Sequence, residues 1–198
     1  MGSKARTQRM KHVISQRIRH VRCVIEAVYH RHNISAILRT CDALGIHTVH
    51  LITDSFRATK GAARGAERWL DVVRHETPEE AISVLRADGY RIYIADLGDD
   101  SVTPEQVPID APVCLWFGAE LVGVSAAAQE AADGVMTIPM RGFAQSLNVS
   151  VAAAIALRPV VERARALGDE ALLTPEVRCA TWDAWMSRAE NVERHSEP

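Results

Sequence analysis

The chain alternates between short apolar runs and segments in which apolar residues recur every three or four positions. The apolar runs have the length and flanking Gly, Pro and charged residues of buried strands, which we predict at 21–28, 47–52, 69–73, 91–95, 112–118 and 135–139. The amphipathic segments predict helices at 32–45, 78–88 and 125–133, and from about 147 and about 175. Strands separated by helices favour an α/β fold with a mostly parallel sheet flanked by helices on both faces.

Capping and stop signals sharpen this prediction. The helix at 32–45 ends at Gly45, a residue suited to the left-handed turn that follows many helices. Thr77 can accept a hydrogen bond from the first turn of the next helix, and we expect Glu80 to reach back to the cap. Pro159 lacks a backbone N–H, so we expect it to kink or end the long helix.

Composition narrows the class of protein. The 198 residues, 47% hydrophobic and 24% charged, are typical of one folded domain and exclude a disordered or fibrous chain. The four cysteines form no C-x-x-C pair that would hold zinc, and we expect mostly buried thiols. The longest apolar stretch, 149–157, is too short for a membrane span, and the basic start lacks the apolar core of a signal peptide. We therefore expect a cytoplasmic protein.

The net charge of −2 hides a strong asymmetry. Residues 1–31 carry a formal charge of +7, whereas the remaining 167 residues carry −9. A basic leading helix suits a phosphate backbone, although a merely solvated charged helix is the alternative. Residues 53–67 predict a further basic, flexible loop. We predict RNA contacts at Arg6, Arg9, Lys11, Arg17 and Arg19.

Several common activities lack their motifs. The chain contains no G-x-G-x-x-G after the first strand, no G-x-x-x-x-G-K-[ST] and no G-x-S-x-G, which removes the main support for dinucleotide, P-loop and serine-hydrolase functions. The histidine pairs 30/32 and 47/50 have no carboxylate placed to complete a metal site. We therefore expect no metal.

The loops after residues 95, 118 and 139 are the first candidates for a ligand site, because ligands of parallel sheets bind beyond the carboxyl ends of strands. The second of these loops, FGAELVGVS (117–125), places a glycine beside Glu120. The third begins IPMRGFAQSLNVSVAAAIAL (138–157), in which polar Ser146 and Asn148 introduce a helix of small apolar residues. The alternative is that Ser146 caps this helix and Asn148 bonds a local backbone group.

Three segments, HNISAILRTCDALG (32–45), FGAELVGVS and IPMRGFAQSLNVSVA, resemble in this order the signature motifs of the SPOUT superfamily of RNA methyltransferases. The resemblance is to the TrmH-type tRNA 2′-O-methyltransferases and covers about residues 20–160. It implies a parallel sheet whose C-terminal part is threaded into a deep trefoil knot, with short helical extensions at 1–20 and 161–198 around a domain at 21–160. It also implies a homodimer with active sites at the subunit contact.

The same resemblance implies S-adenosyl-L-methionine as cofactor, held mostly through the backbone at Ala95, Gly118, Ile138, Met140 and Leu147. Backbone recognition would explain why no nucleotide-binding motif is present.

The position of Arg39 matches the essential residue of this family, and the residues matching its polar surroundings are Asn33, Glu120, Ser146 and Asn148. Taken alone, Arg39 on an amphipathic helix would suggest an ordinary surface arginine. The implied reaction is in-line transfer of a methyl group to a ribose 2′-hydroxyl, with guanosine 18 of tRNA as target. The alternatives are ribosomal RNA as substrate, whose enzymes commonly carry an N-terminal RNA-binding domain for which 1–20 leaves no room, or a non-catalytic RNA-binding module.

Overall fold

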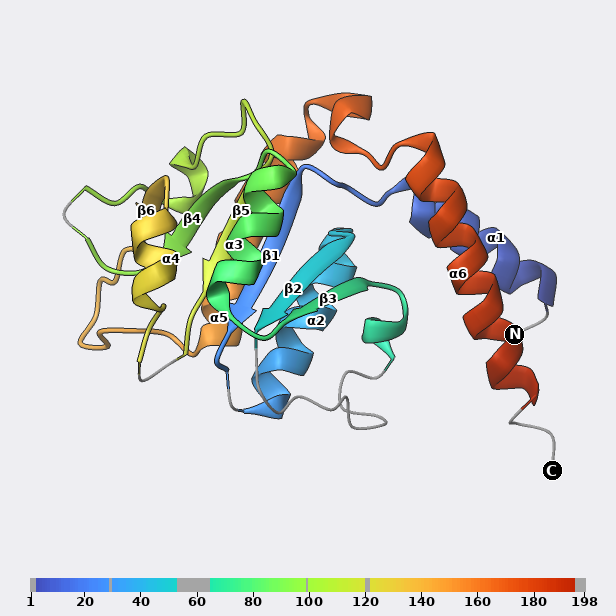
Figure 1. The fold of residues 1–198 in the computed structure, drawn as a ribbon, viewed down its shortest axis with the longest axis horizontal. Coiled ribbons are helices and arrows are strands. Elements are labelled where there is room, and N and C mark those ends of the chain that lie inside the picture. The colour runs from blue at the N-terminus through green and yellow to red at the C-terminus, as the bar shows by residue number, and fades with distance from the viewer. Residues whose placement is uncertain (1–2, 29, 53–64, 99, 120–121, 195–198) are drawn as a thin grey trace.

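The computed structural model describes residues 3–28, 30–52, 65–98, 100–119 and 122–194. Its centre is a six-stranded sheet in which every pair of neighbouring strands is parallel, with strand order β3-β2-β1-β5-β4-β6 (Figure 1). The strands are β1 (Val21–Glu26), β2 (Thr48–Ile52), β3 (Asp71–His75), β4 (Arg91–Ala95), β5 (Val113–Phe117) and β6 (Gly134–Met136). The predicted α/β class is confirmed.

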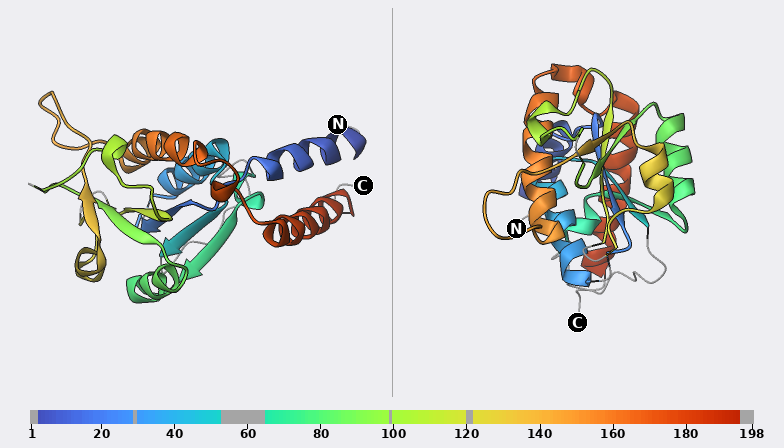
Figure 2. Two further views of the ribbon diagram at one scale, coloured as in Figure 1. Left: turned by 90° about the horizontal axis from the view of Figure 1, so that it is seen from above. Right: turned by 90° about the vertical axis from the view of Figure 1, so that its left-hand side faces the viewer.

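Helices cover both faces of the sheet (Figure 2). One face packs against α2 (Arg31–Leu44) and α5 (Val149–Arg165), and the other against α3 (Pro78–Ala87) and α4 (Ala126–Ala131). All five residues of β5 are buried, because alternate side chains enter the two cores. Short 3₁₀ turns complete the fold at Ala66–Arg68, Pro104–Gln106 and Gly168–Ala171.

The first and last helices, α1 (Ser3–Ser15) and α6 (Pro175–Arg194), run side by side beyond the end of the sheet (Figure 2). Met10, Ile14 and Trp185 form a small buried cluster between them, and the rings of Trp69 and Trp185 meet edge to face at 5.1 Å. The two ends of the chain therefore form one helical projection that carries the basic residues of α1.

Arg17 is the one predicted RNA contact that lies in the interior. Its side chain is fully buried between α1 and the sheet, where it pairs with the carboxylate of Asp42. It also donates to the carbonyl oxygens of Ile46 and Trp69, each at 3.0 Å. The guanidinium is occupied by these internal partners, so the prediction that Arg17 contacts RNA is wrong for this conformation, and its role is to fasten the α1 end to the body.

All the predicted strands and helices are present, and their ends differ from the prediction by at most three residues. Helix α5 continues past Pro159 to Arg165, so the proline does not end the helix. The carbonyl that has no N–H partner at the proline belongs to Ile155, on the exposed side of the helix, where water can bond it. Thr77 caps α3 as expected, but Glu80 accepts from the N–H of Glu76 instead of the cap residue.

Other sequence expectations concern thiols, metals and the basic loop. Cys23, Cys41 and Cys114 are buried and free, and Cys179 is exposed. Within the part of the chain that the structure describes, no three His, Cys, Asp or Glu side chains are grouped to hold a metal ion, and no helix is long and apolar enough to cross a membrane. Most of the expected loop at 53–67 lies outside the described residues.

Two neighbouring strands bury a pair of histidines. Nδ1 of His50 on β2 lies 2.8 Å from Nε2 of His75 on β3, and the rings stack at 5.1 Å. Burial, followed by the nearby charges of Arg22 and His75, lowers the pKa of His50 to about 3. Burial likewise lowers the pKa of His75. Both rings are therefore neutral in the folded protein near neutral pH.

This pair predicts a loss of stability in mild acid. Between pH 6.5 and about 3, the unfolded chain binds a proton at His50 that the folded chain does not, so the free energy of unfolding falls by about 1.4 kcal/mol per pH unit from this residue. We expect His50→Gln to flatten the dependence of that free energy on pH, measured by urea unfolding between pH 7 and pH 4.5. His12→Gln, at an exposed position of α1, is the control. An unchanged slope in His50→Gln would contradict this account.

Candidate functional site

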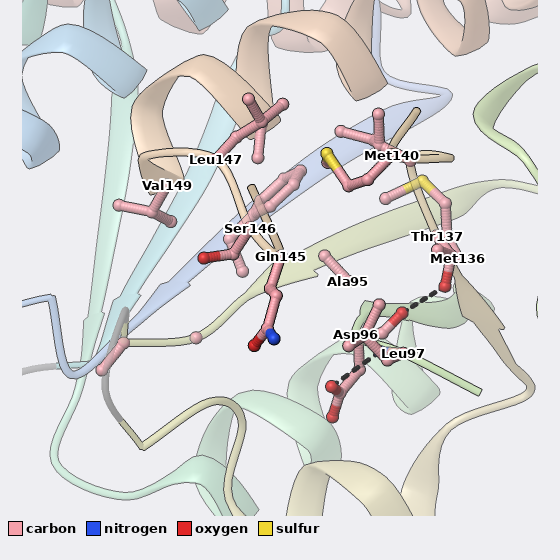
Figure 3. A pocket seen from close by; sticks show the side chains of 15 residues that line it. Ala95, Asp96, Leu97, Met136, Thr137, Met140, Gln145, Ser146, Leu147 and Val149 are labelled. Atoms are coloured by element: carbon pink, nitrogen blue, oxygen red, sulfur yellow. Dashed lines mark hydrogen bonds between the residues drawn. The ribbon is translucent and has the colours of Figure 1, made fainter. Parts of the chain in front are cut away.

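A cavity of about 230 Å³ opens at the carboxyl ends of β4, β5 and β6. Its walls come from the loops after these strands and from the first turn of α5 (Figure 3). The lining is mainly apolar, with the polar side chains of Asp96, Thr137, Gln145 and Ser146 between apolar ones. This is the edge of the sheet at which the sequence predicts a ligand.

The segment 138–147 forms the irregular wall of the cavity. Within the described residues, no backbone N–H of this segment donates to another backbone group, and the segment belongs to no helix or strand. It ends at Asn148, whose side chain caps α5 by accepting from the N–H of Ser150 at 3.0 Å. A wall of this kind presents unpaired main-chain donors and acceptors, which a ligand or water must satisfy.

The opposite wall depends on glycine. A side chain at Gly118 would put its Cβ 2.2 Å from the carbonyl oxygen of Gly123, so no other residue fits there. The N–H of Ala119 donates to Gly123 at 3.0 Å, and the N–H of Gly123 donates back at 2.8 Å. Gly123 itself has a φ of 74°. These contacts draw the backbone of the loop close to β5 and leave Gly118 and Ala119 facing the cavity.

Asp96 connects the loop after β4 to the loop after β6. The hydroxyl of Thr137 donates to the backbone oxygen of Asp96, and the N–H of Asp96 donates to Met136 at 3.2 Å. The carboxylate of Asp96 accepts from the N–H of Leu97 at 2.8 Å (Figure 3). These bonds fix the relative positions of the loops after β4 and β6.

The cavity brings together the whole predicted set of cofactor-contacting residues. Each of them lines it, and they come from separate stretches of chain: Ala95, Gly118, Ile138, Met140 and Leu147. Sequence reasoning missed Asp96, Thr137 and Gln145. The only signal in the sequence was that each lies next to a predicted residue. Taken alone, each is an ordinary loop residue.

The predicted catalytic residues are only partly assembled in one chain. Asn148 Nδ2 donates to Asn33 Oδ1 at 3.2 Å, joining the start of α5 to the first turn of α2, where Asn33 is buried. Ser146 lines the cavity and caps no helix. Arg39 lies on the exposed side of α2, without an ion pair or hydrogen bond among the described residues, and does not line the cavity. Glu120 falls outside the described residues.

The remaining predicted RNA contacts lie at a distance from the cavity. Arg6, Arg9 and Lys11 belong to α1, and the ammonium of Lys11 lies 5.7 Å from the ring of Trp182 on α6. Arg19 is exposed, between α1 and the amino end of β1. The structure therefore separates a cationic projection from a cavity at the far edge of the sheet.

The lining indicates which chemistry the cavity can perform. Among the described residues around it there is no histidine, cysteine or lysine that could act as nucleophile or base. Apolar side chains suit a flat ring, while main-chain groups and a few polar side chains suit hydroxyl and amino groups at its edge. The polar side chains that do line the cavity are those of Asp96, Thr137, Gln145 and Ser146.

Comparison with known proteins adds three findings. The sequence model of the SpoU rRNA Methylase family matches residues 20–158. The chain is 35% identical to a tRNA (guanosine(18)-2′-O)-methyltransferase of Thermus thermophilus over 193 residues, which cover 94% of this chain and 98% of that one. The structure resembles the crystal structure of an A. aeolicus TrmH/SpoU tRNA modifying enzyme, with a TM-score of 0.85, 29% identity and coverage of 94% and 97%.

A further solved structure carries a ligand. The SpoU methyltransferase AviRb from Streptomyces viridochromogenes, in complex with the cofactor AdoMet, matches with a TM-score of 0.68 and 26% identity, over 78% of this chain and 64% of that one. The family model matches well over half of the residues, and the fold is similar to solved structures that carry the SpoU name. The chain belongs to the SpoU rRNA methylase family.

Proposed function

We propose that this protein transfers the methyl group of S-adenosyl-L-methionine to the 2′-hydroxyl of a ribose in tRNA, with guanosine 18 as the target. The cavity after β4, β5 and β6 carries this proposal, because all five residues that the family resemblance assigns to the cofactor line it. The activity for which the Thermus thermophilus relative is named supports the choice of tRNA and of guanosine 18, since that relative aligns over nearly its whole length.

The cavity fits this cofactor by its chemistry. Apolar Ile138, Met140 and Leu147 would cover the adenine, and the unpaired backbone groups of 138–147 would bond its edge. When bound, the cofactor supplies an electrophilic methyl group on a sulfonium that is already a good leaving group. The protein's task is then to exclude water and to align the ribose hydroxyl, and alignment alone supplies roughly 7–11 kcal/mol of such a barrier.

Arg39 acts in this proposal as a fixed cation. A guanidinium does not lose its proton in proteins, so Arg39 cannot be the base that removes the hydroxyl proton. It holds the phosphate beside the target ribose and stabilises the negative charge that develops on the 2′-oxygen, while the proton passes to that phosphate or to water. Asn33 and Asn148, joined at 3.2 Å, orient the start of α5 and hence Ser146.

The position of Arg39 supports a homodimer. Arg39 does not line the cavity of its own chain, so the partner's Arg39 would have to complete the site. Helix α5 exposes Val151 and Ile155, one turn apart, at 46% and 45%, and Phe143 in the preceding loop is fully exposed. We propose that a second copy covers this apolar face and brings its arginine to the cofactor.

Two further parts of the proposal concern topology and location. Helix α5 follows the edge strand β6 yet packs against β1 and β5 at the centre of the sheet. This return of the chain supports threading of the C-terminal part into the trefoil knot. A tRNA substrate supports the cytoplasm as the place of action.

Labelled S-adenosyl-L-methionine, incubated with the protein and separate pools of tRNA and ribosomal RNA, tests the proposed reaction. We expect label on tRNA, mapped by nuclease digestion to the ribose of guanosine 18. Label on ribosomal RNA alone would replace the substrate, and RNA binding without any transfer would favour the non-catalytic module.

Substituting Arg39 tests its role as a forked cation. Lysine keeps the charge but cannot bond two phosphate oxygens at once, so Arg39→Lys should lower kcat by roughly 100-fold, as removal of a donor to a developing oxyanion does. The cofactor Kd should stay within about twofold. Arg91→Lys, at an exposed ion pair with Asp110, provides the control in single-turnover assays. Near-normal turnover of Arg39→Lys would overturn the assigned role.

The basic projection should set RNA affinity in a salt-dependent way. Replacing Arg6, Arg9 and Lys11 together with Gln should weaken tRNA binding about equally for different tRNA sequences, because phosphates carry no sequence information. The steepness of log K against log salt should fall by about 0.7–0.9 for each phosphate that the variant no longer neutralises. Filter binding at several salt concentrations measures both, with Arg91→Gln as control. An unchanged slope would remove α1 from the interface.

A further inference from the structure

A buried carboxylate stands at the carboxyl end of the central strand β1. Glu26, the last residue of this strand, is only 5% exposed, on the face of the sheet that packs against α3 and α4. It makes no ion pair among the residues that the structure describes. Burying such a group is costly unless hydrogen bonds compensate it, so its partners indicate why the site contains it.

Two donors from distant segments bond the same oxygen of Glu26. The indole N–H of Trp116 on β5 lies 2.7 Å from Oε2, and the backbone N–H of Ser125 lies 3.2 Å from it. Ser125 is the N-cap of α4, and its hydroxyl accepts from the N–H of Ala128. The carboxylate therefore joins three elements: the end of β1, the neighbouring strand β5 and the beginning of α4.

The chain between the two partners includes one wall of the cofactor cavity. Trp116 precedes this wall on β5, and Ser125 follows it, while Gly118 and Ala119 between them line the cavity. The two hydrogen bonds between Ala119 and Gly123 close the base of the loop. Glu26 is thus a fixed point outside the cavity that holds both ends of the segment forming its wall.

The backbone of Glu26 is itself held in place. Glu26 pairs with Ile52 in the register of β1 and β2, and the N–H of Ala27 donates to the carbonyl oxygen of Ile52 at 3.0 Å. Ala27 has a φ of 51°, a left-handed conformation that disfavours most residues with a side chain. The backbone from which the Glu26 side chain extends is therefore held by the sheet, and the chain turns away directly after it.

We propose that Glu26 is a positioning residue for cofactor binding, which sets the place of the Gly118–Ala119 wall by bridging Trp116 and Ser125. The identity of the cofactor rests on the proposed function, whereas the effect on the loop does not. Glu26 touches neither cofactor nor RNA in this role. Its effect is transmitted through two hydrogen bonds to the backbone that lines the cavity.

Three variants test this role. Glu26→Ala removes the bridge, and Glu26→Gln keeps its length and one acceptor oxygen at the same place. Asp133→Asn is the matched control, because Asp133 likewise accepts from a side chain, that of Arg86, and from the backbone N–H of Ile92, but does not line the cavity. Each variant is studied by hydrogen exchange of the backbone amides without ligand, by calorimetric titration with S-adenosyl-L-methionine and by thermal unfolding.

The proposal predicts an effect confined to the loop and to the cofactor. Glu26→Ala should speed exchange of the described amides in 118–125 at least tenfold and weaken cofactor binding at least tenfold. Glu26→Gln should restore the affinity to within about threefold of the wild type. Asp133→Asn should lower Tm yet leave both the exchange of the loop and the cofactor affinity within twofold.

Where Glu26→Ala folds, either of two results would overturn the proposal. One is an unchanged loop and affinity in Glu26→Ala; the other is an Asp133→Asn variant that loosens the loop as much, which would show general destabilisation. If Glu26→Ala does not fold, Glu26→Gln decides instead, since its loop should exchange about two- to fivefold faster than in the wild type and an unchanged rate contradicts the proposal. A wild-type protein that binds no S-adenosyl-L-methionine would refute the proposed function, while the exchange of the ligand-free loop would still decide the role of Glu26.

Discussion

The structure depends on one constraint: at the carboxyl end of the parallel sheet, the backbone N–H and C=O groups of one segment lack backbone hydrogen-bond partners. The strands bond one another along their length, but the backbone of 138–147 finds no such partners in the described chain. A ligand that supplies hydrogen bonds to this segment gains specificity without a dedicated polar side chain. This explains how a chain without a nucleotide-binding motif forms a cavity suited to a nucleotide-like cofactor.

Such a site requires that its loops be held from outside, because among the described residues the segment 138–147 makes no backbone hydrogen bonds of its own that would fix it. Three anchors serve this purpose. Asn148 caps α5 and bonds Asn33, Thr137 bonds the backbone of Asp96, and Glu26 bonds Ser125. Each anchor lies at the end of a regular element, so the rigidity of the sheet and helices is passed to the loops that line the cavity.

The sequence predicted what depends on local pattern and on motif. The strand at 91–95 was placed correctly to the residue, and all five cofactor positions line one cavity. Charge and spacing could not predict which arginine becomes internal. Arg17 looks like its neighbours in the sequence, but Asp42 and two carbonyl groups from distant segments surround it in the fold.

The role of Glu26 was hidden for the same reason, because its partners Trp116 and Ser125 lie 90 and 99 residues away in the chain. Helix α5 continues through Pro159, where the carbonyl of Ile155 that lacks an N–H partner lies on the exposed side of the helix. The local sequence does not reveal this exposure. Contacts between distant segments therefore decided the places of Arg17 and Glu26, which local pattern could not predict.

The most direct test of the central claim is a crystal structure of the protein with S-adenosyl-L-homocysteine, the product form of the proposed cofactor. The account predicts the adenine between the Gly118 wall and the segment 138–147, bonded mainly to backbone atoms. A ligand bound elsewhere, or held in this cavity chiefly by charged side chains, would contradict it.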